Sequence, residues 1–474
     1  MSISSLADGF EQATYDAWRE RVSGALKGAD FASLASHTAE GIAVEPLYLP
    51  ASAKPIASRP AGAAWDIVAV ADHTDVGAAN RQVLDDLEGG ASSISIAFAH
   101  ATNAGGFGLS QSGDTLRGLL QDVYLDLVHL RIEPHPRSRR SAHWLADLFE
   151  QRGIEPVRAT VSFGLDPIGN FARLGALSAD GETVSGRLAG TVDLLRRKGF
   201  AGRVVEADGR PYNSAGATDA QELGAVLATA VHYLRALTET GGLGVDEAFS
   251  TIGVSLAADQ HQLTTTAKMR AMRLLWRRLQ DLCDAEPSDL RLHAETARRM
   301  MMADDPHTNL LRTTLAAFAA GTGGADSITI LPYTCALGLA DAQARRMSRN
   351  LHHLMIEESN LHRVADPAAG SGAIEALTEN LCQAAWAEFQ TIEGEGGILE
   401  SLQSGAIQSR IGAARDALLN SIAADSEPFV GATIYPNATP AKVTLLGAEP
   451  WPEPESNDVV LACTPLSPAA LVKM

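Results

Sequence analysis

Cysteine is scarce in this sequence, and basic residues are outnumbered by acidic ones. The 474 residues include four cysteines, which lie far apart and form no C-x-x-C pair. This spacing predicts neither a disulfide framework nor a cysteine-based metal site, and we expect reduced thiols in a cytoplasmic protein. The formal net charge is −19. Because phosphate backbones are bound by basic surfaces, this charge argues against nucleic acid as a partner.

Long apolar runs and metal-binding motifs are also missing. A membrane-spanning helix needs about 18 consecutive apolar residues, and the sequence has no such run, so it predicts no membrane partner. The N-terminus, MSISSLADGFEQ, lacks a basic segment followed by an apolar one, so no export signal is expected. No H-E-x-x-H or equivalent spacing occurs, and no metal site is predicted.

A regular alternation of short β-type runs with longer helical stretches begins at Trp65. Strict β–α alternation implies right-handed crossovers and a parallel sheet, and eight units favour a closed barrel. The predicted fold class is α/β: a parallel (β/α)8 TIM-type barrel with an N-terminal extension and a C-terminal helical and linker segment. The eight predicted strands are 94–98, 123–131, 157–163, 203–206, 249–255, 290–293, 327–331 and 362–365.

The chain divides into four predicted parts. Residues 1–64 form an irregular N-terminal arm, which is too short of core residues to fold alone and must contact the barrel or a partner. Residues 65–370 form the barrel, and residues 371–425 form a C-terminal helical segment. Residues 426–474 are rich in proline, which is typical of a linker or tail.

Several stretches resemble the barrel-bearing part of methylmalonyl-CoA mutases. Residues 289–314 resemble the L-R-T-H-S-Q-T…A-Q-D-P-Y-N-N segment of that family, and 214–234 resemble its E-A-G-A-T…E-L-A segment. KMRAMRLLW (268–276) and ESNLHRVADPAAGSGAIEALT (358–378) match two further motifs. The resemblance covers nearly the whole chain, and the N-terminal stretches FASLASHTAEGIAVEPLYLP and WDI…DLEGGASSISI look most like the small, non-catalytic subunit of heterodimeric mutases.

This resemblance implies an isomerase of propionate metabolism that interconverts methylmalonyl-CoA and succinyl-CoA by radical chemistry on adenosylcobalamin. In active members, the pantetheine of the substrate threads the barrel axis, and a separate domain supplies a histidine ligand from a D-x-H-x-x-G loop. No D-x-H-x-x-G sequence occurs here. The resemblance therefore implies adenosylcobalamin at the level of a complex only, with none bound by this chain.

Four positions depart from the catalytic pattern of the family. Val70 stands at the place of a catalytic tyrosine in W-T-I-R-Q-Y-A-G-F, and Ser162 at that of a glutamine in T-I-Q-N-D. Pro211 and Thr329 replace the histidines of G-Y-H-M-Q-E-A-G-A and S-L-H-T-N. Each lost donor or acid typically lowers a rate roughly 10²–10⁴-fold. We therefore predict no catalytic residue in this chain.

Other positions have predicted roles in binding or in architecture. Tyr212 and Asn213, which follow Pro211, and Arg291, which could face an anionic acyl-CoA, are the predicted substrate-binding residues. Residues that match the family motifs are interpreted as a buried polar network that holds helices to strands. They are His293, Asp305, Asn309, Arg312 and Asp366.

Three functional hypotheses follow from these features. The first is a non-catalytic barrel subunit that pairs with a catalytic mutase subunit, or with a second copy of itself. The second is an acyl-CoA mutase half-enzyme that uses a separate cobalamin-domain protein. The third is a non-catalytic module that binds acyl-CoA or protects a partner.

Overall fold

The computed structural model describes residues 13–52, 55–56, 59–177, 179–424, 426–437, 439, 442–452, 462–463 and 465. Eight strands form one parallel sheet in the order β6-β5-β4-β3-β10-β9-β8-β7. Backbone hydrogen bonds from Phe163 to Arg203 and from Leu165 to Val204 join β6 to β7 and close the sheet. The strands are β3 Asp66–Ala71, β4 Ser93–Ile96, β5 His129–Ile132, β6 Val161–Ser162, β7 Val205–Asp208, β8 Ile252–Ala258, β9 Leu292–Thr296 and β10 Ser327–Thr329.

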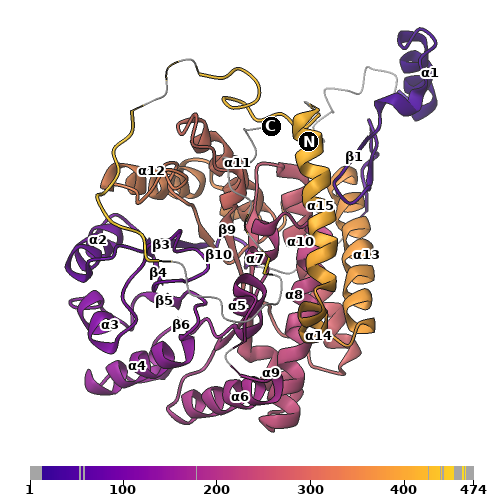
Figure 1. Cartoon of the computed structure of the whole chain (residues 1–474). Coiled ribbons are helices and arrows are strands. Elements are labelled where there is room, and N and C mark those ends of the chain that lie inside the picture. Colours follow the sequence, from indigo (N-terminus) through magenta and orange to yellow (C-terminus); the bar gives the residue numbers. More distant parts are fainter. Residues whose placement is uncertain are drawn as a thin grey trace, which may run out of the picture.

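Helices follow the strands in turn and surround the barrel (Figure 1). This arrangement confirms the predicted (β/α)8 barrel. Between strands lie α2 Val76–Glu88, α3 Gly113–Leu119, α4 Ser138–Gln151, α5 Pro167–Leu174, α6 Gly181–Arg197, α7 Arg210–Ala215, α8 Asp219–Arg235, α9 Val245–Thr251, α10 Gln262–Leu282 and α11 Thr308–Thr322, and α12 Ala342–His353 follows β10.

One strand was missed, one predicted strand is absent, and three others begin clearly later than predicted. The first barrel strand is Asp66–Ala71, which the alternation did not include. Conversely, residues 362–365 are not a strand, because Leu361–Arg363 form a 3₁₀ turn after Asn360, whose φ of 56° is left-handed. The number of strands was right only because the missed strand and the absent strand offset each other. At the three late strands, residues 123–128 are not strand, 157–158 lie in a 3₁₀ turn, and 249–251 lie in α9.

Two segments lie outside the barrel: one precedes it in the sequence and the other follows it. The N-terminal region contains α1 Tyr15–Ala25 and a small antiparallel pair, β1 Ser36–His37 and β2 Ala43–Val44. Figure 1 shows α1 standing away from the barrel, and no residue of this helix is buried. The C-terminal helices are α13 Gly372–Gly394, α14 Ile398–Ser404 and α15 Ala406–Ala423, and α13 packs against α8 and α10.

The architectural interpretation of the family-matched residues is confirmed for Asn309 and Asp366. The Asn309 amide accepts from the Met302 N–H at 3.0 Å and donates to the Met302 and Tyr333 carbonyls at 2.8 and 2.9 Å. The Asp366 carboxylate accepts from Arg270 of α10 and from the Ile56 N–H at 2.9 Å. These bonds fix a loop after β9 and attach the N-terminal segment to the barrel.

Part of the predicted tail, residues 453–461, 464 and 466–474, lies outside the described residues, as do residues 1–12 of the predicted arm. Within the described part of the chain, no helix is both long and apolar enough to cross a membrane.

Candidate functional site

Polar side chains alternate with apolar ones along the barrel strands. In β5 and the residue after it, H-L-R-I-E, the side chains bond to other elements of the barrel: His129 to Ser162 of β6, Arg131 to Glu206 of β7, and Glu133 to Arg210 of α7. Leu130 and Ile132 belong to the hydrophobic core. Because successive side chains of a strand point to opposite faces, one face of β5 lines the barrel interior with charge and the other packs against helices.

Arg131 is the first centre of this interior network. Its guanidinium donates to Glu133 Oε1 at 2.9 Å, to Glu206 Oε1 at 3.1 Å and to the Ser255 hydroxyl at 2.7 Å. The Ser255 hydroxyl in turn donates to Glu206. Strands β5, β7 and β8 are thereby joined through side chains that lie inside the barrel.

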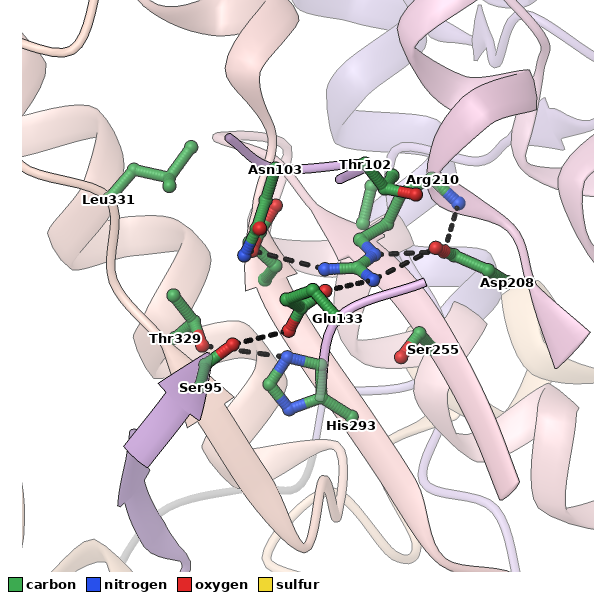
Figure 2. A network of polar contacts seen from close by, with 12 residues as sticks. Ser95, Thr102, Asn103, Glu133, Asp208, Arg210, Ser255, His293, Thr329 and Leu331 are labelled. Atoms are coloured by element: carbon green, nitrogen blue, oxygen red, sulfur yellow. Dashed lines mark hydrogen bonds and ion pairs between the residues drawn. The ribbon is translucent and has the colours of Figure 1, made fainter. Parts of the chain in front are cut away.

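Arg210, the first residue of α7, is the second centre (Figure 2). Its guanidinium donates to both carboxylate oxygens of Asp208 at 2.8 Å, to Glu133 Oε2 at 2.7 Å and to Glu295 Oε2 at 3.1 Å. The Asn103 amide adds a bond of 2.8 Å to Glu295. Glu133 therefore bridges the two guanidiniums and links the carboxyl end of the barrel to its middle.

Burial and pairing act against each other on the carboxylates of this network. Burial favours the neutral form of Glu133, but the guanidiniums of Arg210 and Arg131 outweigh it and hold the pKa of Glu133 well below its usual range. For Glu295, burial dominates over the attraction of Arg210 and raises the pKa. Four carboxylates share only two guanidiniums in this network. The positive charge is therefore too small to keep every carboxyl ionised, which explains the raised pKa of Glu295.

Two neutral histidines occupy the amino-terminal half of the interior. His129 lies between the Asp66 carboxylate at 3.0 Å and the Ser162 hydroxyl at 3.1 Å. His293 lies 2.9 Å from the Ser327 hydroxyl through Nδ1 and 3.5 Å from the Thr329 hydroxyl through Nε2. Burial lowers the pKa of both imidazoles, and that of His293 falls well below its ordinary value.

The lowered pKa of His293 leads to a pH prediction. An unfolded imidazole binds a proton below about pH 6.5, whereas folded His293 stays neutral, so its contribution to stability is present above pH 6.5 and is lost as the pH falls below it. Stability is therefore expected to fall between pH 6.5 and 5 in part through this residue. Urea unfolding of the wild type and of His293→Gln at pH 7 and 5 measures it, and an equally steep fall in both proteins would contradict the assignment.

Comparison with known proteins identifies the family of this barrel. The family model described as methylmalonyl-CoA mutase matches residues 49–452. The chain belongs to the methylmalonyl-CoA mutase family. A methylmalonyl-CoA mutase small subunit of Streptomyces virginiae is 37% identical over 460 residues, which covers 92% of this chain and 72% of that protein. The small subunit of Propionibacterium freudenreichii subsp. shermanii is 32% identical, with coverage of 91% and 70%.

The four positions that depart from the mutase pattern lie on four different elements of the barrel. Val70 is near the carboxyl end of β3 and packs against a cluster of alanines that includes Ala97 and Ala101. Ser162 of β6 and Thr329 of β10 are buried on opposite sides of the barrel, each next to one of the two histidines. Pro211 is buried in the first turn of α7. None of the four carries a carboxyl or imidazole group.

The three predicted substrate-binding residues are not brought together. Tyr212 and Asn213 follow the carboxyl end of β7 and are buried; Asn213 donates to Glu222 at 3.1 Å. Arg291 lies before the amino end of β9, where it forms an ion pair with Asp66. The two groups thus lie at opposite ends of parallel strands, and their part in binding an acyl-CoA stays a prediction.

A cobalamin that takes a protein lower ligand needs an imidazole with a free ring nitrogen. Both histidines inside the barrel have their two ring nitrogens next to side-chain oxygens, so neither offers a free nitrogen to a cobalt ion. Among the described residues, no group of three or more His, Cys, Asp or Glu side chains could hold a metal ion. Neither of these two imidazoles is therefore placed to act as the lower ligand of a cobalamin.

The interior network is the feature that the sequence reasoning missed. A signal for it was present, because parallel strands covered by helices normally read as continuous apolar runs. The stretches H-L-R-I-E, V-E-A-D and L-H-A-E-T instead place a polar residue at every second position. That pattern indicates a barrel whose interior is filled by charge.

Proposed function

We propose that this chain is the non-catalytic barrel subunit of an adenosylcobalamin-dependent methylmalonyl-CoA mutase and pairs in the cytoplasm with a catalytic subunit. The observation that carries the proposal is the network of charged side chains bonded to one another across the barrel. In catalytic barrels of the family the pantetheine occupies this axis. Here an acyl-CoA could enter only by separating Arg131 and Arg210 from their carboxylates, at a cost of several kcal/mol for each buried ion.

The residues at the mouth of the barrel support the same conclusion. Neither Val70 nor Pro211 has a side-chain donor, and Pro211 also lacks a backbone N–H. A group that stabilises the developing charge of a reacting thioester is therefore missing at two of the family positions. Both relatives are named as small subunits of a mutase, which fits a partnership with a second, catalytic subunit.

The N-terminal segment supplies a surface for such a partner. Residues 13–35 contain no buried side chain, although they include Tyr15, Trp18 and Phe31. The Trp18 ring lies 5.4 Å from Tyr15 and 5.8 Å from Phe31, and the three rings form one aromatic group. Aromatic side chains that are only partly buried are typical anchors of protein–protein interfaces.

An activity assay with restored residues tests the proposal. We expect the variant Val70→Tyr, Ser162→Gln, Pro211→His, Thr329→His to show no turnover of methylmalonyl-CoA, because the charged network still fills the axis. The assay supplies adenosylcobalamin and a separate cobalamin-domain protein, and the wild-type chain is measured beside the variant. Succinyl-CoA formed by the wild-type chain would overturn the proposal in favour of a half-enzyme, and turnover by the variant alone would show that the axis is accessible.

A further inference from the structure

A cavity lies away from the barrel axis, just beyond the carboxyl ends of β5 and β6. It has a volume of about 320 Å³, is open to solvent on one side, and is lined by α4, α5 and α6 together with the loops that follow the two strands. This volume falls within the range of small-molecule sites. The apolar part of its wall consists of Leu165, Leu174, Leu177, Val184 and Leu188.

Four arginines line the same cavity: Arg137, Arg139, Arg140 and Arg187. All four are exposed, and among the described residues none of them forms an ion pair with a carboxylate. Burial and the nearby Arg187 lower the pKa of Arg139, which shows that like charges face each other here. In a chain of net charge −19, four arginines gathered without an ion pair to any described carboxylate make a local cationic site. Asp180 is a counter-charge near them, and hydrogen bonds from Thr183 together with the Arg187 guanidinium lower the pKa of its carboxyl.

The start of α4 adds to this positive field. The helix has 14 residues, and its first turn contains no acidic side chain. At its N-cap stands Arg137, which makes no side-chain capping bond. Because the first N–H groups of a helix and its dipole attract anions, an uncapped start next to arginines favours a phosphate or a carboxylate.

Two residues that line the cavity, Asp166 and Asn170, each carry one buried polar atom without a hydrogen-bond partner in the described part of the chain, which is an observation independent of the arginines. The two atoms are Asp166 Oδ2 and Asn170 Oδ1. The two side chains are 0% and 9% exposed. Buried polar atoms are rarely left unpaired in native proteins, so a group from outside the chain is expected to complete them.

These two atoms offer a matched pair of hydrogen-bonding groups. The other oxygen of Asp166 already accepts from the Gly169 N–H at 2.8 Å and from the Tyr233 hydroxyl. Burial, reinforced by the charge of Asp208, raises the pKa of Asp166 to about 8. At neutral pH the carboxyl is therefore mostly protonated, and it can donate from Oδ2 while Asn170 Oδ1 accepts, as a hydroxyl or amide group of a ligand requires.

We propose that this cavity binds a phosphorylated small molecule of nucleotide size. Its phosphates lie at the arginines and the start of α4, its uncharged body lies on the leucine wall, and a hydroxyl or amide group bonds to Asp166 and Asn170. The site is separate from the barrel axis and does not depend on the partnership with a catalytic subunit.

Calorimetric titration of the full chain with ADP, coenzyme A and inorganic pyrophosphate tests this site. We expect ADP to bind saturably at one site and more tightly than pyrophosphate, because the body of the ligand adds contacts. Coenzyme A carries the same diphosphate, so its binding would identify a CoA compound as the source of the phosphates. Binding of ADP without coenzyme A would identify a free nucleotide, and either result supports the site.

Matched charge-reversal variants test whether the arginines of the cavity are responsible for binding ADP. The double variant Arg137→Glu, Arg140→Glu is expected to weaken ADP binding at least tenfold, about 1.4 kcal/mol. The control, Arg278→Glu with Arg346→Glu, changes the net charge equally at exposed arginines of α10 and α12 and is expected to alter the affinity less than about twofold. Arg187→Glu on α6 serves as a second pocket variant should the first fail to fold. Equal losses in pocket and control variants, or no saturable binding of any probe, would overturn the proposal.

Discussion

Replacing Arg210 by methionine is expected to lower the free energy of unfolding by about 3–5 kcal/mol, the usual cost of removing one partner from a buried ion pair. The substitution keeps most of the side-chain volume but leaves Asp208, Glu133 and Glu295 without their shared cation. All three carboxylates are buried, and Arg210 itself is only 3% exposed. The penalty therefore comes from unpaired buried charge rather than from a cavity.

Urea unfolding curves of the wild type and of Arg210→Met measure this effect at pH 7. The matched control is Arg278→Met, at an exposed arginine of α10, which should change stability by less than about 0.5 kcal/mol. The deficit of Arg210→Met is expected to shrink at lower pH, because the unpaired carboxylates can then take up protons. A variant as stable as the wild type at pH 7 would show that the network does not hold the barrel interior together.

Removal of residues 1–35 is expected to weaken association with a catalytic mutase subunit at least 100-fold, about 3 kcal/mol. This expectation rests on the proposed partnership. The deletion stops before Glu40, whose carboxylate accepts from the Ala220 N–H at 3.2 Å, so it spares that contact between the arm and the barrel. It removes the aromatic group around Trp18, whose Phe31 ring also contacts the Arg19 guanidinium of the same segment.

Surface plasmon resonance with an immobilised catalytic subunit compares the shortened and full-length chains. The unfolding midpoint of the isolated chain should change little, because residues 13–35 bury no side chain. Leu127→Ala is a suitable control, since Leu127 is 76% exposed in the loop before β5, and its replacement should leave the affinity within about twofold. Undiminished binding by the shortened chain would place the interface elsewhere.

The sequence predicted the barrel well because its repeated unit is local. Strand runs such as 203–206 are set by neighbouring residues, and this run was found close to the true strand, β7 Val205–Asp208. The strand Asp66–Ala71 was missed because a short apolar run does not by itself distinguish a strand from other buried segments. The segment 362–365, H-R-V-A, is not an apolar run; it was predicted wrongly because the left-handed φ of Asn360, which precedes a 3₁₀ turn, is not visible in the local pattern.

The interior of the barrel could be predicted only in part. The four departures from the mutase pattern are visible in the sequence, but the contacts that replace the lost chemistry join residues far apart in the chain. Glu295 bonds to Asn103 and Arg210, which lie 192 and 85 positions away. Alternation can show that a strand carries charge on one face, but only the closed barrel shows which carboxylate meets which guanidinium.

Turnover of a reconstituted complex tests the central claim most directly. The chain is co-expressed with a catalytic mutase subunit, and the purified complex is assayed with adenosylcobalamin and methylmalonyl-CoA, once with an intact partner and once with a partner inactivated in its own active site. Our account predicts a stable complex that is active with the intact partner and inactive with the inactivated one. Failure to associate, or succinyl-CoA formed at an undiminished rate with the inactivated partner, would contradict it.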